Sequence, residues 1–115
     1  MKIGIIGLLT DINSVVEKSI AKDFTYQDPV AVVNVLAAEL KETKGCDLVI
    51  CLSHLGYLED KSLAAGIRNV DLIVGGHSHT KLKDKKVFKN VDGEDVVVVT
   101  DWKWGLQIGR LDIDF

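Results

Sequence analysis

The feature that most constrains this chain is an alternation of apolar, strand-like runs with helix-like segments. Three almost uninterrupted apolar runs, at residues 2–9, 47–52 and 70–74, are separated by segments that contain apolar residues at helical spacing. A strand that is apolar on both faces is typical of a parallel sheet with cover on both sides. Strand, helix, strand, helix, strand with short connections therefore predicts βαβ units and an α/β fold class.

The first predicted helix has the clearest boundaries. Asp28 can cap the free amides of the first turn, and the proline after it suits the first helical position. Apolar residues then recur at helical spacing as far as Lys44, where a lysine and a glycine end the helix. A second helix is predicted over residues 59–67. Residues 10–27 are predicted to form a long excursion with a short helix near residues 14–21.

The pattern changes after Thr80. Residues 81–86 carry four lysines and are predicted to form a solvated loop. Residues 87–91 and 95–100 flank an Asp-Gly pair, which is a strong hairpin signal. Residues 106–115 are predicted to add another antiparallel strand. The expected architecture is therefore parallel βαβ units followed by antiparallel strands.

Composition narrows the class of protein. A chain of 115 residues has the size of one domain, and 47% apolar with 27% charged residues excludes intrinsic disorder. The net charge of −3 argues against a nucleic-acid partner. No apolar run is long enough to cross a membrane, and the first residues are predicted to be a strand and not a secretory signal. Cys46 and Cys51 lack metal-site spacing and are predicted to be small buried side chains.

All three histidines of the chain follow predicted parallel strands. His54 comes after the second strand, and His77 and His79 come after the third strand and a Gly-Gly pair. Ligands of open α/β sheets bind outside the carboxyl ends of the strands, so these imidazoles are expected to converge. In an extended segment His77 and His79 would lie on one side, about 6–7 Å apart. The pattern predicts a metal or phosphate site; the alternative is three ordinary polar residues at strand ends.

Two motifs, Ser-His-Leu-Gly at residues 53–56 and Gly-Gly-His-Ser-His-Thr at residues 75–80, carry a family resemblance. At this spacing they resemble the C-terminal half of a calcineurin-like metallophosphoesterase, closest to the 5′-nucleotidase branch. The opening KIGIIGLLT and the closing stretch from Gly93 resemble that branch as well. The resemblance implies a partial metallophosphoesterase sandwich. Residues 1–115 would be one partial catalytic domain whose N-terminal half is missing.

By this resemblance the whole protein would be a metal-dependent phosphoric ester hydrolase that acts on a nucleotide or phosphomonoester. His54 and His77 would bind one of two divalent metals, and His79 the other. Zinc, manganese, nickel and cobalt are all compatible with such a site. The D-x-H, G-D and G-N-H blocks that supply the family's remaining ligands are missing from this sequence, and Asp11 does not form a D-x-H block.

The missing blocks have a physical consequence. Three neutral imidazoles cannot offset the repulsion between two neighbouring divalent cations, whereas three imidazoles and water suit one ion. We therefore expect at most one metal and little or no phosphatase turnover from this chain alone, and we assign no catalytic residue. The alternatives are a non-catalytic α/β module that binds one metal or a phosphate ligand, and a partner-binding remnant.

The remaining expectations concern residues outside the histidine motifs, self-association of the chain and its cellular location. Asp47 and Asp71 begin strands at the edge away from the histidines, so both are predicted to be structural. Trp102 and Trp104 are predicted to anchor the core or an interface. A sheet that has lost part of its cover tends to recruit another chain, so we expect self-association. The resemblance implies a periplasmic or cell-surface location.

Overall fold

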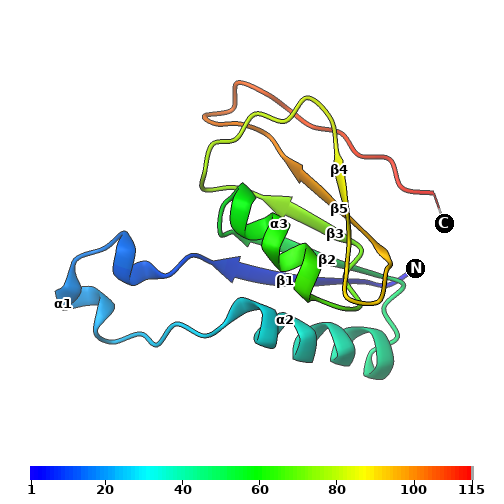
Figure 1. Ribbon diagram of the computed structural model, residues 1–115, viewed down its shortest axis with the longest axis horizontal. Helices are drawn as coiled ribbons and strands as arrows, with labels where there is room; N and C mark the ends of the chain where they lie inside the picture. Colours follow the sequence, from blue (N-terminus) through cyan, green and yellow to red (C-terminus); the bar gives the residue numbers. More distant parts are fainter. Residues whose placement is uncertain (115) are drawn as a thin grey trace.

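A computed structural model describes residues 1–114 and shows a five-stranded mixed sheet (Figure 1). The strand order is β1-β2-β3-β5-β4. The first four strands in this order run parallel, and β4 is antiparallel to β5. The strands are β1 (Ile3–Leu9), β2 (Leu48–His54), β3 (Leu72–Gly75), β4 (Lys86–Lys89) and β5 (Asp95–Thr100). This topology confirms the predicted α/β class and the predicted antiparallel hairpin.

Two helices connect the parallel strands. Helix α2 (Pro29–Ala38) continues directly into the π-helical turn η2 (Glu39–Thr43), and α3 (Tyr57–Gly66) lies between β2 and β3. The side chain of Asp28 accepts a hydrogen bond from the backbone N–H of Ala31 at 3.0 Å, which confirms the predicted cap. The excursion after β1 contains two short turns of helix, η1 (Ile12–Ser14) and α1 (Lys18–Ala21), in place of the single short helix expected there.

The core lies between α2, α3 and one face of the sheet. Ile6, Cys51, Ile73 and Val98 are partners in register across β1, β2, β3 and β5, and all four are at most 4% exposed. The helices and Ile67, which directly follows α3, contribute buried apolar side chains that pack onto this row; the helical ones are Val33, Ala37, Leu63 and Ala64. The apolar periodicity found in the sequence therefore marks the side of each helix that faces the sheet.

The opposite face of β1 and β2 is open. Ile5 is 66% exposed, Leu52 is 57% exposed and Leu9 is 59% exposed. Successive side chains of a strand point to opposite faces, so these residues alternate with the buried ones. Strands β1 and β2, which read as apolar in the sequence, are thus covered on one face only.

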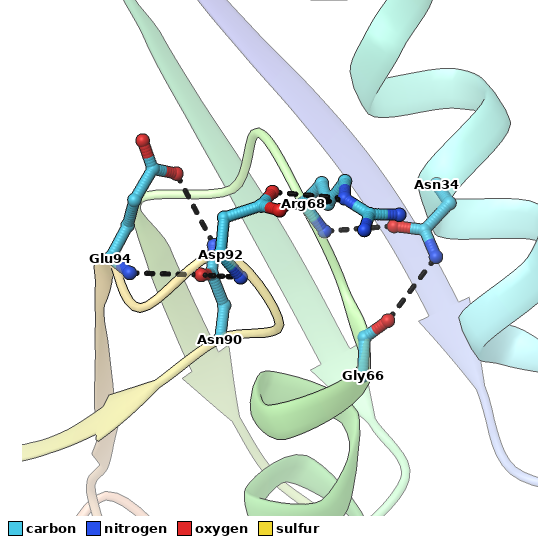
Figure 2. Close-up of polar contacts among 6 residues, drawn as sticks. All are labelled: Asn34, Gly66, Arg68, Asn90, Asp92 and Glu94. Carbon is cyan, nitrogen blue, oxygen red and sulfur yellow. Dashed lines mark hydrogen bonds and ion pairs between the residues drawn. The ribbon is translucent and has the colours of Figure 1, made fainter.

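Polar contacts connect the segments at the amino-terminal ends of the parallel strands, opposite the ends that carry the histidines (Figure 2). The side chain of Asn34 on α2 donates to the carbonyl of Gly66 at 3.2 Å and accepts from the N–H of Arg68 at 2.8 Å. Arg68 also pairs with Asp92 in the β4–β5 turn at 2.9 Å. The side-chain oxygen of Asn90 then accepts the N–H of Asp92 at 2.9 Å, which shapes that turn. These polar groups form hydrogen bonds and an ion pair with one another, so we assign this end of the sheet a structural role.

Asp47 and Asp71 have structural roles at the same edge, as predicted. Asp47 accepts the N–H of Lys2 at 2.6 Å. Asp71 accepts the N–H of Val49 at 2.7 Å and pairs with Lys41 at 2.9 Å. Both carboxylates join the starts of neighbouring strands.

Residues 106–114 form no strand, so the strand predicted over residues 106–115 is wrong for them. Residue 115 lies outside the part of the chain that the structure describes. The backbone N–H of Gly109 donates to the side chain of Asp101 at 2.8 Å in place of a neighbouring strand. An apolar alternation becomes a strand only where a ladder partner is available. Of the helices in residues 1–114, none combines the length and apolar character that a bilayer span requires.

Candidate functional site

The structure brings two of the three histidines together at the carboxyl edge of the parallel strands. His54 is the last residue of β2, and His77 follows β3 by two residues. Their ring centroids are 5.1 Å apart, with 64° between the ring planes. Both side chains are exposed, and His54 borders an open hollow of about 550 Å³ formed by the ends of β1, β2 and β3. The predicted meeting of strand ends is therefore confirmed for this pair.

His79 lies elsewhere, because the segment around it is not extended as expected. The backbone adopts left-handed φ values of 70° at His77 and 52° at His79, and the N–H of Ser78 turns back to the carbonyl of Gly76 at 2.9 Å. The ring of His79 packs edge-on against Trp104, at 6.3 Å between centroids. Residues other than glycine rarely adopt positive φ, and such positions concentrate at functional sites.

Small residues and a serine tie the two histidine loops together. A Cβ atom at Gly76 would lie 3.1 Å from Nδ1 of His54, so a glycine at this position leaves room for the His54 imidazole. Across the gap, the N–H of Tyr57 donates to Oγ of Ser78 at 3.0 Å, and this hydroxyl contacts Thr80 Oγ1 at 2.8 Å. Ser78 thus links the start of α3 to the loop after β3.

The donor set suits part of a metal centre. Neutral imidazole nitrogens are good ligands for zinc, cobalt and nickel. Within residues 1–114, however, no group of three or more His, Cys, Asp or Glu side chains is placed to hold one ion. The expected convergence of three imidazoles is therefore not found. The pair of His54 and His77 offers two donors, and a complete centre needs others.

Asp60 is a buried carboxylate beneath this pair, and the sequence reasoning missed it. It lies on α3, is 1% exposed and accepts a short hydrogen bond from the hydroxyl of Ser53, the residue before His54. A signal was available: Asp60 precedes Leu63 by three residues and Ala64 by four, which places an acid on the apolar face of a helix. Aspartate side chains are almost never fully buried unless they are paired with another group.

Burial raises the pKa of Asp60, and the charge of Glu59 raises it further, against a lowering contribution from the Ser53 hydrogen bond. The folded state therefore holds the Asp60 proton more tightly than the unfolded chain does. This contribution to stability is complete below the unfolded pKa of 3.8 and is lost as the pH rises through the higher folded pKa.

We expect the free energy of unfolding of the wild-type chain to fall as the pH rises above about 4, and the Asp60→Asn variant to show a flatter profile. Urea denaturation followed by circular dichroism at several pH values measures both curves. Glu42→Gln is the matched control, since Glu42 is an exposed carboxylate that does not contribute to the pKa of Asp60. Parallel curves for the wild type and Asp60→Asn would contradict the assignment.

Trp104 packs against His79, and neither tryptophan belongs to the buried core. Trp104 is 76% exposed, so of the two placements predicted for it the core is wrong and the interface stays a prediction. The ammonium of Lys103 lies 4.0 Å from the Trp104 ring centroid, and that of Lys81 lies 4.4 Å from the Trp102 ring centroid. Each ring makes a cation–π contact with a lysine ammonium, which stabilises an aromatic ring at the surface.

Comparisons with known proteins agree with this geometry. The chain is 32% identical over 128 residues to the NAD 5′-nucleotidase of Haemophilus influenzae, covering 99% of the chain and 21% of that protein. It is 30% identical over 128 residues to a probable 5′-nucleotidase of Treponema pallidum, with the same coverage of 99% and 21%. The solved 5′-nucleotidase precursor from Thermus thermophilus superposes with a TM-score of 0.77 at 36% identity, over 90% of this chain and 22% of that one.

The fold is of the metallophosphoesterase type. The chain is similar to part of a 5′-nucleotidase, and it spans about a fifth of the length of these two relatives. No family model matches it. The motif resemblance found in the sequence is thus supported by relatives and by structure at the level of a partial domain.

Proposed function

We propose that this chain is the histidine-bearing part of a metal-dependent phosphoric ester hydrolase of the 5′-nucleotidase kind, acting on nucleotides or related phosphomonoesters. The observation that carries the proposal is the His54–His77 pair, with ring centroids 5.1 Å apart at the ends of two adjacent parallel strands. The names and folds of the relatives support the class of reaction. Residues 1–115 would then be one partial catalytic domain.

In this proposal His54 and His77 hold one divalent cation, and His79 belongs to a second centre that other segments complete. A cation at the pair would act as a Lewis acid toward a phosphoryl oxygen. The chain's own contribution is to present the imidazoles with fixed orientation at an open hollow. Because the cations' anionic ligands would come from outside this chain, we expect it to bind at most one metal and to turn over little or no substrate.

Two measurements test the proposal. The first is hydrolysis of AMP and an aryl phosphate in the presence of Mn²⁺ or Co²⁺, by this chain and by a chain extended with the coding sequence that precedes residue 1. We expect turnover from the extended chain only. Equal activity of the two chains would contradict the division of the site, and inactivity of both would contradict the proposed function.

The second measurement is a Co²⁺ titration of this chain followed by visible absorption. We expect His77→Ala to weaken binding at least about tenfold, since one of two donors is removed. His79→Ala is the matched control and should change the affinity less than about twofold, because this ring packs against Trp104. Cobalt binding without hydrolysis by the extended chain would favour the alternative, a non-catalytic module that binds one metal.

Self-association belongs to the proposal, because the bare face of β1 and β2 presents exposed Ile5, Leu9 and Leu52. Sedimentation velocity should show a species heavier than the 12.6 kDa chain, and Ile5→Lys should shift it toward the monomer. A wild-type chain that stays monomeric at high concentration would contradict this expectation. A periplasmic or cell-surface location is proposed by analogy with the relatives alone.

A further inference from the structure

Asp60 occupies an unusual place between the two strand ends that carry the histidine pair. It comes from the first turn of α3, and its carboxyl group lies against Ser53 near the end of β2 and against Gly75 at the end of β3. The residue is 1% exposed. Neither the hydrolysis of a phosphate ester nor the binding of a metal requires an acid at this buried position.

One oxygen of Asp60 is connected to the loop of His54. Oδ1 accepts the hydroxyl hydrogen of Ser53, and the same hydroxyl oxygen accepts the backbone N–H of Leu55 at 3.2 Å. The two residues that flank His54 in the chain are thus joined through Ser53 to the carboxyl group. This network restricts the backbone on both sides of the His54 imidazole.

The other oxygen of Asp60 lies against the strand that leads to His77. Any Cβ atom on Gly75 would clash with Oδ2 of Asp60, so the carboxylate fills the space that a side chain would take. In the part of the chain that the structure describes, Oδ2 is the one buried side-chain oxygen or nitrogen that has no hydrogen-bond partner. Such groups are rare in native proteins, because a buried oxygen without a partner has lost its hydrogen bonds to water and gained none in return.

We propose that Asp60 is a positioning residue that sets the separation of the His54 and His77 imidazoles by holding the ends of β2 and β3. This inference rests on the proposed function. An apolar residue at position 60 would pack without an unpaired oxygen, yet it could not hold Ser53. The buried acid therefore lowers the stability of the fold, and it fixes the geometry of the histidine pair.

The test compares Asp60→Ala, Asp60→Asn and the matched control Leu63→Ala. Leu63 lies on the same helix, is 2% exposed and packs in the core. Each folded variant is titrated with Co²⁺, and its stability is measured by urea denaturation. We expect Asp60→Ala to weaken Co²⁺ binding about tenfold, as is typical for a group that orients metal ligands. Asp60→Asn, which keeps an acceptor for Ser53, should recover most of that affinity.

Leu63→Ala should lower stability while changing the Co²⁺ affinity less than about twofold, because it removes packing and not orientation. The inference is overturned if Asp60→Ala binds Co²⁺ as the wild type does, or if Leu63→Ala weakens binding equally. If Asp60→Ala does not fold, Ser53→Ala replaces it, since this variant removes the same hydrogen bond with little change in volume.

A metal-independent measurement separates this inference from the proposed function. If the wild-type chain binds no Co²⁺, the proposed metal role fails, yet the ring geometry can still be measured. At 5.1 Å between centroids, the His54 and His77 ring protons should show a nuclear Overhauser effect. We expect Asp60→Ala or Ser53→Ala to weaken it and Leu63→Ala to leave it intact. An unchanged effect in the Asp60 and Ser53 variants would overturn the positioning role.

Discussion

Replacing Ile73 by alanine is expected to lower the free energy of unfolding by about 3–4 kcal/mol. Ile73 is fully buried in β3, the middle strand of the sheet, between Cys51 of β2 and Val98 of β5. The substitution removes buried methyl groups and leaves a cavity that three strands cannot close. A chain of this size has about 5–15 kcal/mol of stability, so the loss is a large share of it.

Urea denaturation followed by circular dichroism measures this loss. Ile73→Val should cost only about 0.5–1.5 kcal/mol, because a single methylene is removed. Val87→Ala on the edge strand β4 is the surface control: Val87 is 48% exposed, and its loss should stay near about 0.5 kcal/mol. An Ile73→Ala variant that unfolds within about 1 kcal/mol of the wild type would show that the core relaxes around this position.

The part of the fold that could be predicted from the sequence is the part with local or periodic signals. Apolar runs and the Asp28 cap marked β1, β2, β3 and α2, since burial and capping act within one segment. The order of strands beyond the βαβ units depends on pairing between distant segments, for which one sequence carries no periodic signal. Residues 106–114 show this limit, because their alternation predicts a strand that finds no partner.

The candidate site was predictable to a similar degree. The positions of His54 and His77 follow from the rule that parallel strands present their carboxyl ends at one edge. The position of His79 does not, because left-handed φ values at two non-glycine residues are a tertiary outcome. Asp60 was not singled out in the sequence, although its spacing from Leu63 places it on the buried side of the helix.

Cys51 is expected to be almost inert to alkylation in the folded chain, and its labelling rate should report on the same core as Ile73. Burial raises the pKa of Cys51 to about 12 from an ordinary value of 9.0, with Asp60 adding a smaller contribution. A rise of this size lowers the thiolate fraction about 1000-fold, and the thiolate is the reactive form. The side chain is also fully buried, so reagent reaches it only when the structure opens.

The measurement is iodoacetamide labelling at about pH 8 of the Cys46→Ser variant, which leaves Cys51 as the reacting thiol. We expect labelling at least about 1000-fold slower than for the same chain unfolded in urea. Ile73 is the partner of Cys51 across β2 and β3. If opening is global, a loss of about 3–4 kcal/mol in Ile73→Ala should speed labelling about 140- to 700-fold, since about 1.4 kcal/mol corresponds to a factor of ten. A rate within about tenfold of the unfolded chain, insensitive to Ile73→Ala, would mean that β2 opens locally. The strand that carries His54 would then be too mobile to hold an imidazole in place, so this rate tests the rigidity on which the histidine pair depends.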